Sequence, residues 1–541
     1  MNLLLTLFLL KSILLLTPSY IHPDEHHQCG TPGSLPHAHP SLPWEFHPPH
    51  PLRTYAHPDA ICRAPLALLD HALTHLILPA YPLAPSSLAL LRALAPRIAM
   101  LLLTTALDAL ILATANINPN SPSLSWSNGC AILSVAWPYL LLSTRPFTNS
   151  LEAYAAALSL ALLPSPSSSS SSSSSISLPL IARIGIVCGM GIYLRPSFAG
   201  FALGIALLLL ARIVREETRD TSSILSISSI LSIAKRVSQY TILGATTVAI
   251  TFAIGSTYDT YAYSTSTSAA PWVFPPANFV AYNSNTDSVA AHGLHPRVTH
   301  VLVNTWIVLG PIWPLLLIAL FWHRLPHAWE AALPGLTHLA LLSLVPHQEF
   351  RFILPLLPSA VAAVAPLLFP SSPTRKDDVV LSPTWRRVFT TSLVLHTIAC
   401  IAIFGILHQG GVVTGVASTL DHIPHHASSS TPPTLIAYKM YMPPWYILGN
   451  DHGLDLVDLG GPPLATLVET LLTASSDPVY LLTPSSIEFP SPPTPDFPFS
   501  LRLLHRTPFH LSFEDPDLVH LSMRLFAVTF TCSGASCPQR T

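Results

Sequence analysis

The sequence predicts an all-α polytopic membrane protein, and both its composition and its pattern point to that fold class. Only 10% of the 541 residues are charged and 50% are hydrophobic, whereas a soluble domain carries about 25% charged residues. Long apolar runs recur along most of the chain, as expected for repeated membrane crossings. The 55 prolines gather between those runs, where they favour loops over helices.

About eleven apolar runs are predicted to be transmembrane helices. Several are shorter than the ~20 residues that cross ~30 Å of hydrocarbon, so we expect their ends to extend into the flanking loops. The first run contains Lys11 and is not followed by a small-residue cleavage site, so we interpret it as a retained span rather than a cleaved signal peptide. Asp108 lies inside the second run and should face the protein interior with a hydrogen-bonding partner. The runs are 2–17, 96–115, 130–143, 150–163, 178–194, 197–213, 239–256, 301–321, 331–346, 352–369 and 389–407.

The charged loops predict the orientation of the chain in the membrane. Only the loops at 214–238 and 370–388 are basic, and alternation of the spans puts both on one side, which is the cytosolic side by the positive-inside rule. A Ser/Pro tract at 164–177 falls on that side and is predicted to be a disordered linker. The loop at 18–65 and the tail from 408 fall on the opposite side, with most of the unusual polar motifs. We therefore expect a transmembrane module over 1–407 and a non-cytosolic region over 408–541, with a functional site on the non-cytosolic face.

Charge and cysteine usage exclude several classes of protein. The formal net charge is −2 and no basic cluster is present, so nucleic acid is not an expected partner. None of the seven cysteines forms a CxxC pair, which argues against a zinc ribbon or a thioredoxin-like site. Cys532 and Cys537 could form a disulfide in an oxidising lumen or remain thiols, and the sequence does not choose between these states.

Two adjacent carboxylates follow the first apolar run directly, in the stretch "SYIHPDEHHQ" at 19–28. A partly desolvated carboxylate at the membrane boundary can act as a general base toward a hydroxyl group, which makes Asp24 and Glu25 candidate catalytic residues. The alternative is an interfacial acidic pair that only reaches toward water. The neighbouring His22, His26 and His27 have weak metal-ligand spacing, so no metal site is predicted.

Arginines on the same face are candidates for binding a phosphate group. Each occurs singly in a short loop, and the planar guanidinium can make paired hydrogen bonds to phosphate oxygens. For each one the alternative is an ion pair with a nearby acid, such as Glu152 or Glu349, or a juxtamembrane anchor. The four arginines are Arg145, Arg195, Arg297 and Arg351. A base and a phosphate-binding group on one face fit a lipid-phosphate group transferase, and they fit a lipid-phosphate phosphatase or an anion transporter nearly as well.

Short motifs along nearly the whole chain carry a more specific resemblance. They are "HPDE" at 22–25, "WEF" at 44–46, "PLRTY" at 51–55, "RPFTNSLE" at 145–152, "DTY" at 259–261, "NFVAYN" at 278–283, "HGLHPRVTHVLVN" at 292–304, "HQEFRF" at 347–352, "LHQGGVV" at 407–413, "YKMYMPPW" at 438–445 and "HLSFED" at 510–515. In this order the motifs resemble the GPI mannosyltransferases of glycosyltransferase family 22. "HPDE" and the "HQEFRF" motif are shared across the family, whereas "HGLHPRVTHVLVN", "LHQGGV" and "YMPP" favour the branch that adds the fourth mannose. The chain departs from the family pattern at His26-His27, at Pro146 and in its poly-serine tract.

The resemblance implies a GT-C-type bundle in the endoplasmic reticulum membrane, with a lumenal active site and lumenal loops. It implies dolichyl-phosphate mannose as the donor and the third mannose of the GPI precursor glycan as the acceptor. The product would be an α-1,2-linked fourth mannose, formed with inversion. Because the donor carries an activated phosphate, no cofactor and no metal ion are required.

The resemblance also implies roles for particular residues. Asp24, with Glu25 as the second choice, would accept the proton of the attacking hydroxyl. Arg351, supported by His347, would stabilise the departing phosphate, with Arg145 and Arg195 as second choices. The residues expected to contact substrate are His22, Glu349, His295, Arg297 and Asp259.

Two other functions remain open at this point. The first is another dolichyl-phosphate-mannose-dependent mannosyltransferase of family 22, acting on the third GPI mannose position or on the N-glycan precursor. The second is a polytopic transporter or flippase, which would move its substrate without forming a glycosidic bond and often shows an internal repeat. No such repeat is visible in this sequence.

Overall fold

The computed structural model describes most of the chain. The described residues are 2–19, 29, 44–46, 51–79, 83–117, 129–164, 176–218, 227–266, 272–290, 293–322, 325–369, 381–423, 432–449, 453–474, 478–491, 493–494, 496–513 and 515–531.

The chain divides into two compact units, which we name the helical unit and the mixed unit. The helical unit comprises Met1–Ser12, Trp44–His57 and Met100–Ile398, and the mixed unit comprises Ile13–Pro43, Pro58–Ala99 and Ala399–Thr541. The predicted division into 1–407 and 408–541 stays a prediction.

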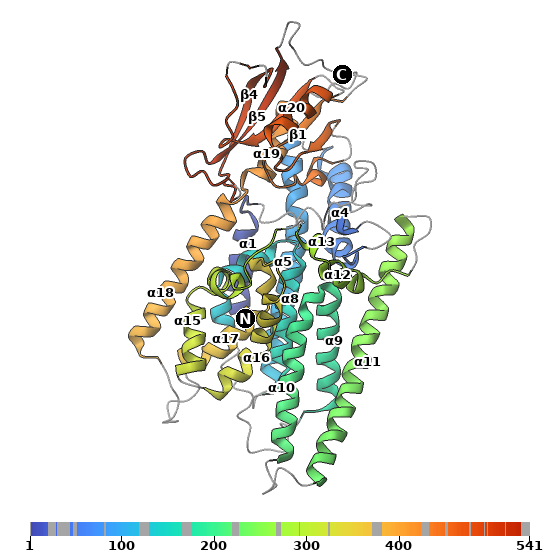
Figure 1. Ribbon diagram of the computed structural model, residues 1–541, viewed down its shortest axis with the longest axis vertical. Helices are drawn as coiled ribbons and strands as arrows, with labels where there is room; N and C mark the ends of the chain where they lie inside the picture. The colour runs from blue at the N-terminus through green and yellow to red at the C-terminus, as the bar shows by residue number, and fades with distance from the viewer. Residues whose placement is uncertain are drawn as a thin grey trace. The chain divides into compact units, whose positions relative to one another are not determined.

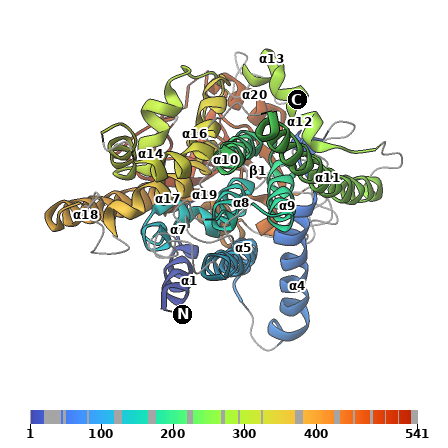
Figure 2. The same ribbon diagram turned by 90° about the horizontal axis from the view of Figure 1, so that it is seen from below.

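The described secondary structure of the helical unit is helical, and Figure 1 shows its helices coloured by their position in the sequence. Seen from below, α8, α9, α10, α16 and α17 lie side by side (Figure 2), and the pairs α8–α9, α10–α16, α16–α17 and α8–α17 are in contact. Its longer helices are α1 (Asn2–Leu15), α5 (Pro85–Ile117), α8 (Thr148–Leu162), α9 (Leu178–Leu194), α10 (Ala199–Thr218), α11 (Ile227–Ser266), α12 (Pro275–Ser284), α16 (Pro326–Ser343), α17 (Leu356–Leu368) and α18 (Pro383–Cys400), and parts of α1, α5 and α18 are counted with the mixed unit. Its shorter elements are η1 (Trp44–Phe46), α3 (Ala56–Pro58), α7 (Trp137–Leu141), η4 (Leu142–Thr144), η5 (Pro196–Phe198), α13 (Thr286–Ala290), η6 (His300–Asn304), α14 (Thr305–Leu309), α15 (Ile312–Leu317), η7 (Ile318–Trp322) and η8 (Phe350–Ile353).

Several helices have the length and composition of membrane spans. Among the described residues four qualify, and a fifth is counted if one bent pair of helices forms a single span. The predicted runs at 96–115, 197–213, 239–256 and 389–407 fall within the four, but the predicted count of eleven is not confirmed. Other runs correspond to shorter apolar helices, such as α9 (Leu178–Leu194) and α17 (Leu356–Leu368). The four are Pro85–Ala115, Pro196–Thr218, Ile227–Ser264 and Pro383–Leu407, and the bent pair is His300–Leu309 with Ile312–Trp322.

Glycines bring α9 and α11 into close contact. The contacts advance in the same direction along both helices, from Gly185 beside Thr247 to Gly189 beside Thr251, so the two helices run parallel. A Cβ atom on Gly185 would lie 2.0 Å from the Thr247 Oγ1 atom. Small residues at such positions let membrane helices pack closely. This pair holds the end of α9, with Tyr193 and Arg195, in a fixed place.

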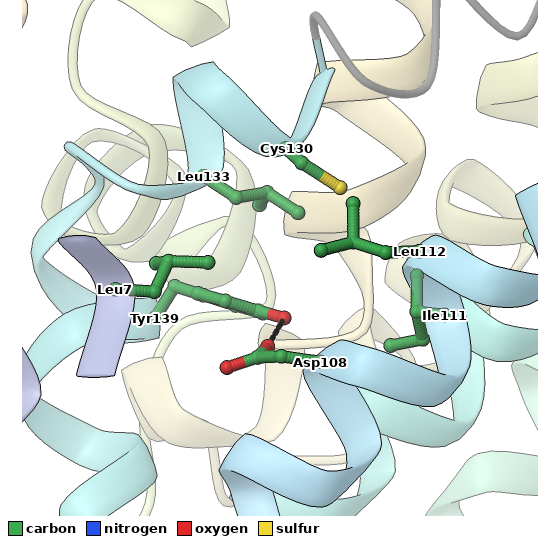
Figure 3. A pocket seen from close by; sticks show the side chains of 7 residues that line it. All are labelled: Leu7, Asp108, Ile111, Leu112, Cys130, Leu133 and Tyr139. Carbon is green, nitrogen blue, oxygen red and sulfur yellow. Dashed lines mark hydrogen bonds between the residues drawn. The ribbon is translucent and has the colours of Figure 1, made fainter. Parts of the chain in front are cut away.

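A polar network inside the helical unit joins α1 to the other helices. The Lys11 Nζ atom donates to Asp108 Oδ2 at 2.5 Å and to the Tyr154 hydroxyl at 2.6 Å, and the Tyr139 hydroxyl donates to Asp108 Oδ1 at 2.5 Å. All four side chains are buried. The prediction that Asp108 faces the interior with a partner is confirmed, and Lys11 supplies the compensating charge. Figure 3 shows Asp108 and Tyr139 beside a small pocket, which is lined by Leu7, Asp108, Ile111, Leu112, Cys130, Leu133 and Tyr139.

The mixed unit contains a five-stranded sheet, so the all-α expectation is wrong for the tail of the chain. The strand order is β2-β1-β3-β5-β4, with β2, β1 and β3 parallel and β3, β5 and β4 antiparallel. β1 and β3 are buried along their whole length, as central parallel strands usually are. The strands are β1 (Thr434–Ala437), β2 (Asp455–Asp458), β3 (Val479–Pro484), β4 (Phe499–Pro508) and β5 (Ser522–Phe530). The helices of this unit are η2 (Asp59–Arg63), α4 (Ala64–Ala72), η3 (Leu73–Ile77), η9 (Ile401–Leu407), α19 (Gly411–His422), η10 (Trp445–Leu448) and α20 (Leu464–Thr473).

A disulfide bond in the mixed unit joins Cys29 to Cys62 across 33 positions of sequence. The sequence did not predict this pairing, because connectivity among scattered cysteines cannot be read from spacing. Cys532 and Cys537, the pair considered from the sequence, lie outside the described residues.

Candidate active site

Eight of the eleven predicted site residues are described, and all eight belong to the helical unit. The other three, His22, Asp24 and Glu25, lie outside the described residues, so their roles stay predictions. The eight are Arg145, Arg195, Asp259, His295, Arg297, His347, Glu349 and Arg351.

Gln348 forms hydrogen bonds that connect two of the sequence motifs. Its Oε1 atom accepts from the His300 amide at 2.8 Å, and its Nε2 atom lies 3.1 Å from each of the carbonyl oxygens of Arg297, Ser343 and Val345. The side chain is buried. Every one of these partners is main chain, so Gln348 fixes the path of both loops, "HGLHPRVTH" and "HQEFRF". No role for Gln348 was predicted from the sequence.

Glu349 joins two of the predicted phosphate-binding residues. Its Oε1 atom lies 2.7 Å from His347 Nε2, and its Oε2 atom accepts from Arg351 Nε at 2.5 Å. Burial of the His347 ring favours the neutral form, but the hydrogen bond and negative charge of Glu349 outweigh burial, so the pKa of His347 is raised above its ordinary value. The ring of His295 lies 5.8 Å from that of His347. Four predicted site residues therefore form one connected group.

A second ion pair holds Arg195. Its Nε atom lies 3.3 Å from Glu152 Oε2 and its Nη1 donates to Thr148 Oγ1 at 3.2 Å. Glu152 also accepts from Ser197 Oγ at 2.6 Å and from Asn149 Nδ2 at 3.0 Å, and it is fully buried. The sequence analysis named Glu152 only as an alternative partner for an arginine. Its place in a polar motif beside three hydrogen-bonding residues was the signal that it is a fixed part of this cluster.

Phe352 connects the two arginines. The guanidinium carbons of Arg195 and Arg351 lie 5.6 Å and 5.3 Å from the centre of its ring, within cation–π range. Its carbonyl oxygen lies 2.9 Å from His338 Nε2, so α16 fixes the position of the residue. We name Glu152, Arg195, His347, Glu349, Arg351 and Phe352 the arginine cluster.

The remaining predicted residues lie outside these contacts. Arg145 is fully buried just before α8. Arg297 is exposed and donates to the Leu344 carbonyl oxygen. Asp259 is buried and accepts from Thr54 Oγ1 at 2.9 Å, from the Tyr55 amide at 2.8 Å and from the Tyr193 hydroxyl at 2.6 Å. Such contacts favour a structural role for Asp259, and its assignment to substrate binding stays a prediction.

The arginine cluster lies at one end of the α10–α16 pair and the basic groups lie at the other. The helices are antiparallel, because Gly200 faces His338 and Gly204 faces Pro334. At the far end of α10, Arg212 and Arg215 pair with Glu330 at 2.9 Å and 2.5 Å. A helix of 20 residues is about 30 Å long, the thickness of the hydrocarbon core. The arginine cluster and the group of Arg212, Arg215 and Glu330 therefore lie at opposite ends of α10, about one membrane thickness apart.

Comparison with known proteins decides the family. The profile of the Alg9-like mannosyltransferase family matches residues 2–449. The chain belongs to the Alg9-like mannosyltransferase family. It is therefore a mannosyltransferase, and the family 22 resemblance is confirmed.

Relatives named as GPI mannosyltransferases match most of the chain. GPI mannosyltransferase 4 of Emericella nidulans is 28% identical over 95% of this chain and 93% of the relative. GPI alpha-1,2-mannosyltransferase 4 of Homo sapiens is 28% identical, covering 94% and 89%. GPI mannosyltransferase 4 of Saccharomyces cerevisiae is 26% identical, covering 88% and 87%.

Among solved structures, ArnT from Cupriavidus metallidurans bound to undecaprenyl phosphate aligns with a TM-score of 0.49 and 11% identity, over 99% of both chains. That score does not assign the GT-C class, which stays a prediction.

In a mannosyltransferase of this family, the arginine cluster offers groups suited to an anionic leaving group. Guanidinium groups provide fixed positive charge and paired donors, and the two glutamates keep the arginines oriented. In the part of the chain that the structure describes, no three His, Cys, Asp or Glu side chains gather in a way that could hold a metal ion. The prediction that catalysis needs no metal stays untested.

Proposed function

We propose that this mannosyltransferase transfers mannose from dolichyl-phosphate mannose to the third mannose of the GPI precursor, forming an α-1,2-linked fourth mannose. The observation that carries the proposal is the match over most of the chain to relatives named GPI mannosyltransferase 4 in three organisms. Because the chain belongs to a mannosyltransferase family, we do not propose the transporter or flippase alternative. The alternative within the family, with a different acceptor, is an outcome of the experiment below.

Asp24, or Glu25 as the second choice, would take the proton from the 2-hydroxyl of the acceptor. The hydroxyl oxygen attacks the anomeric carbon while the bond from that carbon to the phosphate oxygen breaks. A β-linked donor then gives an α-linked product by inversion, with no covalent enzyme intermediate. Dolichyl phosphate departs with the electron pair of the broken bond.

The arginine cluster would stabilise the departing phosphate. Arg351 carries the main role, His347 supports it in its protonated form, and Arg195 and Arg145 are second choices. Glu349 orients Arg351 and His347 through the contacts at 2.5 Å and 2.7 Å. We further propose that substrate is bound with the help of the residues that the family resemblance implies, which are His22, His295, Arg297, Glu349 and Asp259.

The reaction would take place on the lumenal side of the endoplasmic reticulum membrane. Disulfide bonds persist in oxidising compartments such as this lumen, and the bond between Cys29 and Cys62 lies just beyond the proposed base in sequence. The position of the arginine cluster, at the end of α10 opposite Arg215 and Glu330, supports the same side.

The test is the glycan made when this chain replaces the missing fourth-mannose activity of a cell line. We expect the GPI precursor to gain one hexose by mass spectrometry, and an α-1,2-specific mannosidase to remove it. Asp24→Asn should abolish the gain without lowering expression, whereas Asp287→Asn, at an exposed position of α13, should leave it unchanged. A hexose added instead to the N-glycan precursor would assign the other acceptor, and no transfer by well-expressed protein would overturn the proposal. Full activity in Asp24→Asn with inactive Glu25→Gln would move the base to Glu25.

A further inference from the structure

The loop between β4 and β5 exposes large apolar side chains. We name residues 509–521 the β4–β5 loop. Within it Phe509 is 53% exposed, Phe513 49%, Leu518 74% and Val519 83%. Such a concentration of apolar groups in a short loop marks a contact surface rather than ordinary scattered exposure.

Hydrogen bonds attach this loop to the end of a membrane helix. The Leu511 amide donates to the Leu407 carbonyl oxygen at 2.9 Å, and the Gln409 amide donates to the Leu511 carbonyl oxygen at 2.9 Å. Leu407 is the last residue of the apolar span Pro383–Leu407, which is 25 residues long. Because a hydrogen bond joins Leu511 to that last residue, the loop lies at the level where the span leaves the hydrocarbon core.

Ring contacts fix the same attachment. The Phe513 ring stacks on the His408 ring with centroids 4.5 Å apart and planes inclined by 17°, and it lies 6.0 Å from the Phe404 ring. Half of the Phe513 side chain nevertheless remains uncovered by the chain. One face of the ring is therefore used by the protein, and the other is available to a different apolar environment.

Phe509 is held exposed in a strained backbone conformation. Its φ angle is 61°, a region that bulky residues rarely occupy. Its carbonyl oxygen lies against Gly410, where a Cβ atom would approach to 2.2 Å. A strained residue persists only where the surrounding structure imposes it. The surrounding structure therefore holds Phe509 in a strained backbone conformation in which about half of the residue is exposed.

We propose that the β4–β5 loop is an interfacial membrane anchor, and that its partner is the phospholipid leaflet at the non-cytosolic end of the span 383–407. Aromatic and aliphatic side chains at this depth bury apolar area at the boundary between head groups and acyl chains. The other end of the span carries Arg386 and Arg387, which assigns that end to the cytosol. The anchor would fix the height of the sheet above the bilayer.

The charge of the loop limits which lipid head groups it can contact favourably. Its sequence contains Glu514, Asp515 and Asp517 and no lysine or arginine. Asp517 contacts His520 at 2.7 Å. Acidic residues are repelled by anionic head groups, so the leaflet that suits the loop is zwitterionic, such as phosphatidylcholine.

Site-directed spin labelling of the full chain in phosphatidylcholine nanodiscs tests the anchor. A nitroxide is placed at Val519→Cys and, in a second variant, at Leu518→Cys, in a background with Cys532→Ser and Cys537→Ser. The matched control is Leu503→Cys, which is 47% exposed within β4. Power saturation with oxygen and a water-soluble nickel chelate then reports the depth of each label.

We expect labels at 518 and 519 to collide more with oxygen than with the chelate, and the label at 503 to show the reverse. Anionic phosphatidylserine should reduce the oxygen preference at 518 and 519. Equal chelate accessibility at 503, 518 and 519 would overturn the proposal. Protection of 518 and 519 from both reagents would also overturn it in favour of a protein contact, which mass photometry would identify as a second copy. None of these outcomes depends on which sugar the enzyme transfers.

Discussion

Two buried charge networks in the helical unit differ in their exposure to solvent and in the groups that carry their positive charge. Around Asp108, one lysine and two tyrosines surround a single carboxylate, and none of the four side chains is open to solvent. In the arginine cluster, Glu349 and His347 are 22% and 14% exposed in their side chains, and the cations are arginines held by glutamates. The first network holds α1 in place, whereas the second keeps oriented positive charge near the membrane boundary. Substitutions in the first should therefore change stability, and substitutions in the second should change turnover.

The largest effect is expected from removing one partner of the Asp108 network. Lys11→Met leaves a buried carboxylate without its cation, which should lower the free energy of unfolding by about 3–5 kcal/mol. Lys235→Met, at an exposed position of α11, should change it little. Denaturant titration in detergent measures both variants.

A double variant sharpens the same contrast. Lys11→Met combined with Asp108→Leu removes both charges, so it should be more stable than Lys11→Met alone. Turnover per folded molecule should stay near that of the parent enzyme. A double variant less stable than the single one would show that the network is not a simple ion pair.

The next largest effect is expected at Arg351. In the proposed mechanism Arg351→Ala removes a fixed cation from the departing phosphate, so turnover should fall by about 10²–10³-fold, as when other oriented transition-state donors are removed. Arg351→Lys keeps the charge but loses the paired donors, so its turnover should lie between that of Arg351→Ala and that of the parent enzyme. Arg215→Ala, at the opposite end of α10, is the matched control. Unchanged turnover in Arg351→Ala would show that this arginine only forms a structural ion pair with Glu349, which is the alternative considered from the sequence.

A smaller effect is expected at Gln348. Gln348→Leu leaves the His300 amide and the facing carbonyl oxygens without their side-chain partner, which should cost about 1–3 kcal/mol of stability. Hydrogen exchange should rise in residues 293–300 and 343–349 before it rises elsewhere. Parent-like exchange in both segments would show that the motifs do not depend on this contact.

The smallest effect concerns the pH response of His347. Its pKa is raised in the folded protein, so its contact with Glu349 contributes fully below the ordinary value of about 6.5 and is lost as pH rises through the higher folded-state pKa. The His295 ring lies beside that of His347, and Glu349 and Arg351 both influence the pKa of His347. Protection of the amides at 293–300, measured relative to the intrinsic exchange rate at each pH, should therefore fall above that pH in the parent protein and not in His347→Gln. An identical pH profile in the two proteins would contradict the assignment.

The sequence predicts the parts of this molecule that depend on composition and local pattern. Apolar runs identify several spans, and a carboxylate at Asp108 requires a partner inside a membrane, as the structure confirms. The identity of that partner did not follow, because Lys11 lies 97 positions away and only packing brings the two together. The same limit applies to Arg195 and Glu152, and to the junction that Phe352 makes between two arginines.

The sheet and the disulfide show a second limit. β1 and β3 are short buried runs of 4 and 6 residues, which periodicity cannot distinguish from irregular apolar segments. Cys29 and Cys62 belong to no recognisable spacing motif, so only their approach to 5.0 Å between Cα atoms identifies the pair. In both cases the missing information is long-range contact.

The link between Cys29 and Cys62 also bears on how the polypeptide is made. Both thiols are synthesised before the helix that begins at Pro85, so they can meet an oxidoreductase while most of the chain is not yet synthesised. A ring closed that early would constrain the first segment before later helices arrive to pack against it. Biogenesis of this transferase would then depend on oxidative folding at its earliest stage, and reducing conditions during translation would harm it more than the same conditions applied to the finished protein.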